Sequence, residues 1–176
     1  MKITELTDKK IWLTSDWHLG HDNVIKYCNR PFANTSEMNT ALRKNFNKLV
    51  APHDIVYVLG DISFLNTVST TEWIKSLHGF KFLIKGNHDP KTNTAYRKMG
   101  FTEVYDKPII LFDRYILSHE PLFDDEYVDT RFINIYGHLH NNAVNEFANK
   151  YCVSVEKTDY KPISLEQISE EVVKFL

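Results

Sequence analysis

The sequence contains aspartate, asparagine and histidine side chains whose types could bind metal ions. This set consists of two carboxylates, one amide and four imidazoles: Asp16, His18, Asp61, Asn87, His119, His138 and His140. It contains no thiolate, and mixed nitrogen and oxygen donors suit Mn²⁺, Fe, Zn²⁺ or Co²⁺. A site for Mg²⁺ or Ca²⁺, which prefer oxygen ligands, would not need four histidines.

The size of this donor set favours two ions over one. These ligands are too many for a single ion and are reasonable for two, if one carboxylate bridges the pair. Two-metal sites hold their ions roughly 3.5–4 Å apart and suit in-line displacement at phosphorus. The ions lower the pKa of bound water and stabilise the charge that develops on phosphoryl oxygens. The set therefore predicts hydrolytic chemistry on a phosphate ester.

The donors follow short apolar segments that are typical of buried strands. Residues 11–13, 55–59 and 80–84 are predicted strands, and the candidate donors come directly after them. Later strands are predicted at 108–111, 115–117, 133–136 and 151–155. In open α/β sheets, ligands bind outside the carboxyl ends of the strands. The strand ends are therefore expected to deliver the donors to one rim.

Amphipathic stretches alternate with these strands, which favours an α/β protein. Helices are predicted at 37–50, 71–77, 92–99 and 164–176. Ser36 is expected to cap the first of them, and Ser164 with Gln167 is expected to form a capping box on the last.

Five short motifs occur in a fixed order between residues 16 and 140. They read Asp16-Trp17-His18, Gly60-Asp61, Gly86-Asn87-His88-Asp89, Ser118-His119 and Gly137-His138-Leu139-His140. In these motifs the sequence resembles the calcineurin-like metallophosphoesterase superfamily, whose signature is D-x-H, G-D, G-N-H-D, a lone His and G-H-x-H. Any one block is weak evidence, whereas five in family order are strong evidence.

The resemblance implies a role for each residue. Asp16, His18 and His140 would bind a first ion. Asn87, His119 and His138 would bind a second. Asp61 would bridge both.

The resemblance also implies a catalytic histidine, His88, that is not a metal ligand. It would contact the scissile phosphate and protonate the leaving oxygen, as an imidazole with a reference pKa of about 6.5 can do near neutral pH. Asp89 would accept a hydrogen bond from His88 and fix its orientation. Water activated by the metals would attack phosphorus without a covalent intermediate.

The fold implied by the resemblance is a two-sheet β-sandwich flanked by helices, with a dinuclear metal site at one end of the sheets. Residues 1–176 are expected to form a single domain without a separate cap domain, which predicts an open site. Mn²⁺ is the preferred metal because the family often uses it, and Fe, Zn, Co or Ni would also suit the donors.

The composition does not suggest a dedicated duplex-binding protein, and it excludes neither a small nucleotide nor a short oligonucleotide as substrate. The chain has 21 basic and 23 acidic residues and a formal net charge of −2, without the basic excess of a dedicated duplex-binding protein. Cys28 and Cys152 are expected to be free thiols. The sequence shows no secretory or membrane-spanning signature, so the cytoplasm is the expected location.

Several further side chains leave alternatives open. His21 would lie on the rim of the site and contact substrate or make a local hydrogen bond. Arg30 would bind phosphate oxygens or be an exposed charge. Trp17 would pack under its loop or stack on a base, and His53 and His78 are expected at the surface. An acidic segment containing Asp124, Asp125, Glu126 and Asp129 is expected to be a solvated loop that could border the site.

Three functions remain in competition. The first is a phosphoesterase that hydrolyses a phosphomonoester or phosphodiester of a nucleotide or another small molecule. The second is a nuclease of the same superfamily, which steep salt dependence on oligonucleotides would favour. The third is a non-catalytic metal-binding scaffold, against which the intact His88 and ligand set argue. The sequence does not distinguish monoesters from diesters and does not indicate the oligomeric state.

Overall fold

A mixed sheet carries the first three motif loops. The computed structural model describes residues 9–122, 131–143 and 149–173. Its first sheet has the order β4-β3-β2-β1-β9. These strands are β1 (Ile11–Thr14), β2 (Ile55–Val58), β3 (Phe80–Ile84), β4 (Glu103–Tyr105) and β9 (Ile163–Ser164). Strands β1 to β4 are parallel, and β9 pairs antiparallel with β1.

A second sheet carries the last two motif loops and has the order β5-β6-β7-β8. Its strands are β5 (Ile109–Leu111), β6 (Tyr115–Leu117), β7 (Ile133–Tyr136) and β8 (Lys150–Cys152). Strands β6, β7 and β8 are parallel, and β5 is antiparallel to β6. An isolated parallel bridge between Ser15 and Ser154 joins the loops that follow β1 and β8. This bridge brings the carboxyl ends of the two sheets together.

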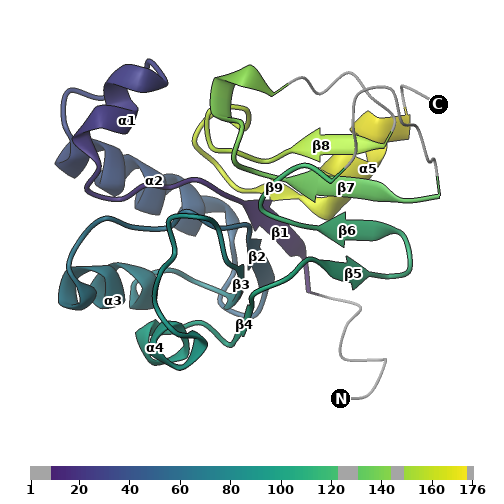
Figure 1. Cartoon of the computed structure of the whole chain (residues 1–176), viewed down its shortest axis with the longest axis horizontal. Helices are drawn as coiled ribbons and strands as arrows, with labels where there is room; N and C mark the ends of the chain where they lie inside the picture. Colours follow the sequence, from purple (N-terminus) through teal and green to yellow (C-terminus); the bar gives the residue numbers. More distant parts are fainter. Residues whose placement is uncertain (1–8, 123–130, 144–148, 174–176) are drawn as a thin grey trace.

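Helices cover the outer face of the first sheet, as Figure 1 shows. They are α1 (Asp22–Tyr27), α2 (Thr35–Leu49), α3 (Thr67–Lys75) and α4 (Asn93–Met99). A fifth helix, α5 (Leu165–Val173), lies on the side of the second sheet, and a short 3₁₀ helix spans His140–Asn142. The predicted two-sheet sandwich flanked by helices is confirmed.

The alternation of side chains along the central strands creates two apolar layers. In β1, Trp12 belongs to the core between the first sheet and its helices, whereas Leu13 belongs to the core between the two sheets. At the end of β2, Val58 likewise belongs to the core beneath the helices, and Leu59 belongs to the core between the two sheets. Successive side chains of a strand point to opposite faces, so a short apolar run with two buried faces anchors the motif loop that follows it.

The ends of the helices differ in part from the sequence prediction. The expected cap of α2 at Ser36 is wrong: Asn34 is the cap, and its side chain accepts a hydrogen bond from the Glu37 amide at 3.0 Å. Helix α3 begins at Thr67 rather than at residue 71, and its cap is Asn66. Asparagine caps a helix as effectively as serine does. A run of polar residues before a helix therefore does not identify the capping residue by itself.

The capping box at the start of α5 is confirmed. The Gln167 amide donates to the Ser164 hydroxyl at 3.1 Å, and the Ser164 amide donates to the Gln167 side chain at 3.1 Å. Helix α1 and strands β4 and β9 were not predicted. They are short, and an edge strand such as β9 is defined by its pairing with β1 rather than by periodicity.

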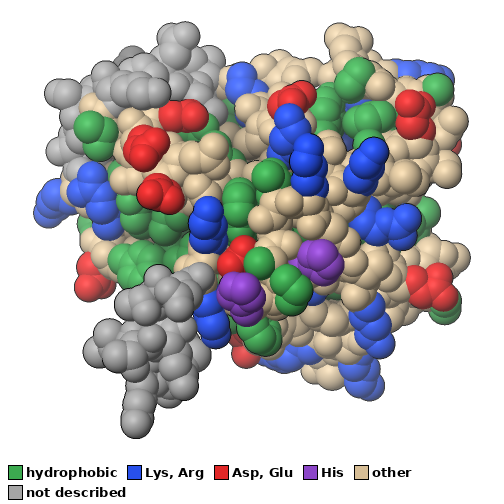
Figure 2. Space-filling view, turned by 180° about the vertical axis from the view of Figure 1, so that it is seen from behind, with side chains coloured by type: hydrophobic (Ala, Val, Ile, Leu, Met, Phe, Trp, Pro, Cys, Tyr) green, Lys and Arg blue, Asp and Glu red, His purple; other side chains and the backbone are tan. Residues whose placement is uncertain are grey.

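The surface carries charges of both signs. Figure 2 shows that Lys and Arg side chains occur across the face opposite to the view of Figure 1, with Asp and Glu side chains also present. The predicted acidic segment with Asp124, Asp125, Glu126 and Asp129 lies outside the described residues. Within the described ranges, no helix is long and apolar enough to cross a membrane. Cys28 and Cys152 are buried free thiols, as predicted.

Candidate metal centre

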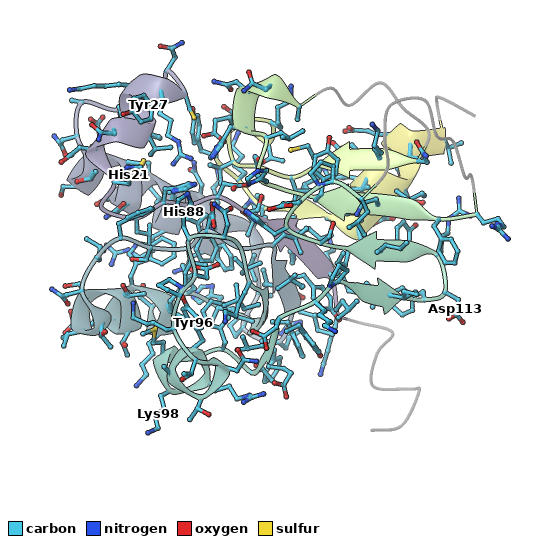
Figure 3. All side chains as sticks on the ribbon, in the orientation of Figure 1. His21, Tyr27, His88, Tyr96, Lys98 and Asp113 are labelled. Carbon is cyan, nitrogen blue, oxygen red and sulfur yellow. The ribbon has the colours of Figure 1, made fainter. Side chains whose placement is uncertain are left out.

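The predicted donors meet where the carboxyl ends of the two sheets converge. Asp16, Asp61 and Asn87 follow β1, β2 and β3 of the first sheet. From the second sheet, His119 follows β6, and His138 and His140 follow β7. Figure 3 shows the labelled His21 and His88 at this edge, and both rings contact the ring of Phe64.

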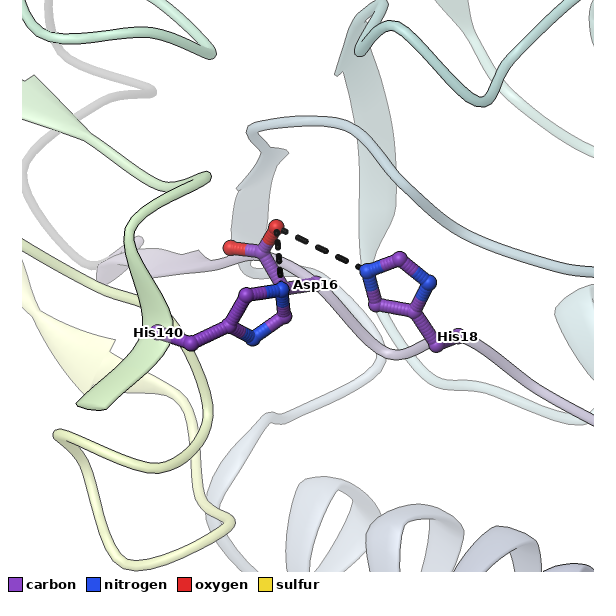
Figure 4. Close-up of side chains that lie close together, drawn as sticks. All are labelled: Asp16, His18 and His140. Carbon is purple, nitrogen blue, oxygen red and sulfur yellow. Dashed lines mark ion pairs between the residues drawn. The ribbon is translucent and has the colours of Figure 1, made fainter. Parts of the chain in front are cut away.

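A first group of donors consists of Asp16, His18 and His140, with donor atoms all within 4.8 Å of one another. Asp16 Oδ1 lies 4.0 Å from His18 Nε2 and 3.9 Å from His140 Nε2. Figure 4 shows both rings directed at the same carboxylate oxygen. Asp16 and His18 are buried, and His140 is half-buried. These separations suit three ligands of one ion placed between them.

A second group consists of Asp61, His119 and His138, whose donor atoms also lie within 4.8 Å of one another. His119 Nε2 is 3.6 Å from Asp61 Oδ2 and 3.2 Å from His138 Nδ1. The Asn87 side-chain oxygen approaches the same His119 nitrogen at 2.8 Å. The structure thus brings together all the donors that the motifs predicted for the second ion.

Asp61 lies between the two groups. Its Oδ2 is 3.4 Å from His18 Nε2 and 3.6 Å from His119 Nε2. Its other oxygen accepts a hydrogen bond from the His88 amide at 2.9 Å. One oxygen therefore faces a histidine of each group while the other is held by the backbone, which is compatible with a carboxylate that bridges two ions through one oxygen.

The chemistry of His18 fits a metal ligand. Its ring is buried, and neither ring nitrogen has a hydrogen-bond partner. Burial, with the nearby charges of His140 and Arg30, lowers the pKa of His18 to about 2. The imidazole is therefore neutral, which is the form that binds metals. A buried unpaired polar group is costly, and a cation between the donors would remove this cost.

Asp16 is oriented mainly through Oδ2, whereas Oδ1 is directed at the two histidines and accepts a longer hydrogen bond from the His138 amide at 3.2 Å. Its Oδ2 accepts hydrogen bonds from Ser15 Oγ at 2.5 Å, Ser154 Oγ at 2.8 Å and the His138 amide at 2.9 Å. Burial raises the pKa of Asp16 above its usual value. A cation at Oδ1 would stabilise the buried carboxylate in its charged form.

Two motif glycines are required by the close approach of the backbone to these carboxylates. A Cβ on Gly86 would lie 2.3 Å from Asp61 Oδ1, and a Cβ on Gly137 would lie 2.6 Å from Asp16 Oδ2. Any side chain at either position would displace a candidate ligand. The glycines of the G-N-H-D and G-H-x-H blocks are therefore explained by geometry.

The loops also hold an unusual backbone conformation. Five of the candidate ligands have positive φ angles of 48° to 69°: Asp16, His18, Asp61, His138 and His140. A non-glycine residue in this region costs on the order of 1–3 kcal/mol. Such strain concentrates at functional sites, where the surrounding packing holds it in place.

Comparison with known proteins agrees with this geometry. Residues 9–174 match the calcineurin-like phosphoesterase family. The chain belongs to this family. The match covers every motif and both sheets, so the predicted resemblance is confirmed. A metal-dependent phosphoesterase activity follows in general terms from the family and from the two donor groups.

The chain is also similar to proteins of archaeal, viral and bacterial origin. It is 38% identical to an uncharacterized protein of Methanocaldococcus jannaschii, over 94% of this chain and 93% of that protein. It is 30% identical to the gene 66 protein of Mycobacterium phage L5, over 76% of this chain and 78% of that protein. The crystal structure of a protein of unknown function from Aquifex aeolicus superposes with a TM-score of 0.74 at 28% identity, covering 93% of this chain and 99% of the other.

His88 stands at the rim of this calcineurin-like site. Its side chain is exposed, and its ring centroid lies 5.7 Å from that of His18 and 5.3 Å from that of Phe64. Only its backbone amide contacts Asp61. The ring is therefore next to the donors and open to an incoming ligand, as the family pattern implies.

The predicted contact between Asp89 and His88 is not found, and this prediction needs correction. Asp89 is buried, and its carboxylate accepts hydrogen bonds within the motif loops. Its partners are the backbone amides of Asp61 at 2.8 Å, Ile62 at 3.2 Å and Gly86 at 2.9 Å, and the Tyr96 hydroxyl at 3.5 Å. Because three amide donors converge on it, the carboxylate links the G-D loop to the G-N-H-D loop, and its hydrogen-bond partners do not include the His88 ring.

One of the two rim predictions is contradicted by the structure, and the substrate contact of His21 stays a prediction. His21 is half-buried and stacks on Phe64, with a centroid distance of 4.3 Å. The expectation that Arg30 is an exposed charge is wrong, because its side chain is buried and bonded to Glu156 and to the carbonyls of Asp16 and Trp17. With its donors directed at protein atoms, Arg30 does not contribute a phosphate contact on the rim.

Three further residues lie as expected. Trp17 is buried, its ring meets those of Phe46 and Trp73 edge to face, and its indole nitrogen donates to Thr14 Oγ1. Packing is therefore its role, and it is not available to stack on a base. His53 and His78 are exposed.

The sequence did not identify Glu156 and Phe64. Glu156 lies beside His140 and Arg30, and their hydrogen bond and charge lower its pKa although burial alone would raise it. Phe64 is 46% exposed and stacks near His18, with a centroid distance of 5.6 Å. Neither residue is part of a motif, and Glu156 is 126 positions from Arg30. No local pattern marked either one.

Two hollows differ in their relation to the donors. A cavity of about 380 Å³ is lined by Asn87, His119 and Gly86, together with Lys85 and Pro108. A larger one, of about 780 Å³, lies at the amino end of β1, beside Lys10 and the start of α5. The smaller cavity adjoins the second donor group and is the one that can receive part of a substrate.

Proposed function

We propose that this protein is a dinuclear metal-dependent phosphoesterase that hydrolyses a phosphomonoester or phosphodiester of a small, nucleotide-like molecule. The observation that carries the proposal is the position of Asp61. Its Oδ2 is within 3.6 Å of one histidine nitrogen from each donor group. A single carboxylate shared by two nitrogen-rich groups is the arrangement expected for two ions side by side.

Each ion would have its own set of ligands. Asp16, His18 and His140 would hold the first ion, and Asn87, His119 and His138 would hold the second. Asp61 would belong to both and reduce the repulsion between the two positive charges. When bound, the ions would supply Lewis acidity, which activates water and neutralises phosphoryl oxygens.

The protein's own contribution centres on His88. Its exposed ring is beside His18 and the Phe64 ring, at the open side of the donor groups. From there it would contact the scissile phosphate and donate a proton to the leaving oxygen. Such proton transfer contributes about 10²–10⁴-fold to rate.

Asp89 would act at one remove from the reaction. Its carboxylate accepts hydrogen bonds from the backbone amides of Asp61 and Gly86. These bonds would fix the distance between the bridging carboxylate and the loop that carries Asn87 and His88. Asp89 is therefore proposed as a positioning residue rather than as the orienter of the His88 ring.

The surroundings of the centre support a small substrate. The cavity of about 380 Å³ beside Asn87 and His119 is at the lower end of the range for small-molecule sites. We also propose that the described residues act as one domain without a cap inserted over the centre. This proposal is supported by the exposure of His88 and Asn87.

Mn²⁺ is the proposed metal. Its support is the mixed nitrogen and oxygen donor set, since the residues proposed for the two ions are aspartate, asparagine and histidine without a cysteine. Zn²⁺ would bind more tightly by the general affinity order. Availability would therefore decide between Mn²⁺, Fe, Zn, Co and Ni.

The test is a side-by-side assay of the purified protein supplied with Mn²⁺. An aryl phosphomonoester, an aryl phosphodiester and a 2′,3′-cyclic nucleotide would be compared with a metal-free sample and with a His88→Ala sample. The proposal expects metal-dependent turnover of at least one ester, reduced by about 10²–10⁴-fold in the variant. An absence of metal-dependent turnover on all three would contradict it.

A single-stranded oligonucleotide in the same assay would separate the nuclease alternative. Cleavage that falls steeply with added salt would indicate neutralisation of several backbone phosphates. Turnover of the small esters with little dependence on salt is expected instead.

A further inference from the structure

Glu156 is a buried carboxylate that none of the motifs includes. Its side chain is 1% exposed. One of its oxygens, Oε1, accepts a hydrogen bond from Arg30 Nε at 2.8 Å and lies 2.6 Å from Arg30 Nη2. The same oxygen lies 2.9 Å from Nδ1 of His140. One atom thus connects a buried guanidinium to a candidate metal ligand.

This contact determines which nitrogen of His140 is available to a metal. A carboxylate oxygen can only accept, so Nδ1 must carry the proton in the hydrogen bond. Nε2 then keeps its lone pair, and it is the atom 3.9 Å from Asp16 Oδ1. A carboxylate behind a ligating histidine fixes its tautomer and ring direction and raises its basicity.

Arg30 holds the carboxylate in place and extends the connection to the first motif loop. Its Nη2 donates to the Asp16 carbonyl at 2.7 Å, and its Nη1 donates to the Trp17 carbonyl at 2.9 Å. The guanidinium therefore binds Glu156 and the D-x-H loop at once. Its charge also compensates the buried carboxylate, which would be costly alone.

Cys28, His140 and Glu156 also lie close enough to form a ligand group. A cation placed there would have to share the Glu156 carboxylate with the Arg30 guanidinium, which already pairs with it. The local charge therefore favours a hydrogen-bonding role for Glu156 over direct coordination.

We propose that Glu156, held by Arg30, is the positioning residue that sets the tautomer and direction of His140 for the first ion. The inference rests on the proposed dinuclear function for its metal and adds a residue to it. The second group has a neutral counterpart, since the His119 Nδ1 lies 2.7 Å from the Leu59 carbonyl. His119 therefore serves as an internal control that does not depend on Glu156.

The first test reads the tautomer directly in the metal-free, full-length chain. Long-range ¹⁵N–¹H NMR of the histidine rings would be recorded at about pH 9, where a free imidazole is neutral. In the wild type, His140 is expected to carry its proton on Nδ1. In Glu156→Ala it is expected to shift toward the Nε2-protonated form, and Glu156→Gln, which keeps an acceptor, is expected to restore part of the wild-type signal. The His119 signals are expected to stay unchanged in both variants.

The second test reads metal affinity by titration with Mn²⁺. Glu156→Ala is expected to lower the affinity for one of the two ions by about 10- to 100-fold. The affinity for the other ion is expected to stay within about twofold of the wild-type value. Asp54→Asn is the matched control: Asp54 is also a buried carboxylate, but it accepts hydrogen bonds from the Trp12 ring and two amides at the amino end of the sheet. Its Mn²⁺ affinities are expected to equal those of the wild type.

These outcomes separate the inference from the proposed function. A wild-type His140 protonated on Nε2, or an unchanged His140 signal in a folded Glu156→Ala chain, would overturn the positioning role even if the enzyme is active. If Glu156→Ala fails to fold because Arg30 is left unpaired, the double change Arg30→Met and Glu156→Ala removes both charges and must give the same tautomer shift. Expected tautomers in a chain that hydrolyses no ester would sustain the positioning role and contradict only the function.

Discussion

The two donor groups share Asp61 but differ in charge and in what holds their histidines. In the first group, Asp16 and His18 are buried, and His140 is backed by the charged Glu156. In the second group, His119 is also buried but is backed by the neutral carbonyl of Leu59, and Asn87 is exposed. The first group also has a carboxylate of its own, whereas the second has only the shared one. A more negative and less solvated group should bind a cation more tightly.

We expect the two donor groups to bind their ions differently because of this difference. The first group is built into the interior, with hydrogen bonds from Ser15 and Ser154 on its carboxylate. The second opens toward the cavity of about 380 Å³ that Asn87 and His119 line. We expect the first ion to be retained and the second to exchange with solvent and meet the substrate first.

The largest effect is expected from the residue that the two groups share. Asp61→Asn should weaken the binding of both ions and abolish turnover, because an amide carries no negative charge to offset the repulsion between two cations. Elemental analysis after dialysis would count the ions. Full retention of one ion would show that Asp61 serves a single group, which would contradict the claim that the two groups share this residue.

The next largest effect is expected from His88, which belongs to neither group. His88→Ala should lower turnover by about 10²–10⁴-fold while both ions remain bound. Parallel measurement of turnover and metal content distinguishes this from a ligand role. If both ions were lost, His88 would have to be reassigned as a ligand.

A smaller effect tests the difference in affinity itself. An additional unit charge near a cation contributes about 1–4 kcal/mol at 4 Å, so a chelator should remove the second ion at a concentration at least about fivefold lower than the first. His138→Ala should eliminate the early step of this titration, and His18→Ala should eliminate the late one. Release of both ions in a single step in the wild type would contradict the proposed asymmetry.

The smallest effect on function is expected far from both groups, at Asp54. Asp54→Asn should lower the free energy of unfolding by about 1–3 kcal/mol without changing metal content. Burial raises the pKa of Asp54, but hydrogen bonds from the Ala51 amide, the Trp12 ring and the Lys10 amide outweigh it, and the pKa lies below its usual value.

The sign of the pH dependence follows from this lowered pKa. The stabilisation by Asp54 is fully present above the unfolded value of about 3.9, and it is lost as the pH falls through the lower pKa of the folded state. Urea unfolding of wild type and variant at pH 7 and at pH 3 would measure this. A stability difference that grows on acidification would contradict the assignment.

Much of the site was predictable because its parts are local. Asp16, Asp61 and Asn87 each follow an apolar strand by two or three residues, so their places at the carboxyl ends could be predicted from the sequence. The capping box of Ser164 and Gln167 was readable for the same reason. The hydrogen-bond partners of Asp89 could not be predicted in this way. Its carboxylate accepts hydrogen bonds from three amides in two loops, and these loops meet only when β2 and β3 pair.

The sequence by itself determined which donors this protein carries, their order and the strands that they follow, since strand periodicity and motif spacing are properties of short segments. Only the tertiary structure decided that Arg30 is buried, that Glu156 supports His140 and that the Leu59 carbonyl supports His119. These features depend on two sheets converging at one edge, where residues more than a hundred positions apart become neighbours. Charge and solvent exposure at a site are set by that packing, and no single segment contains the information.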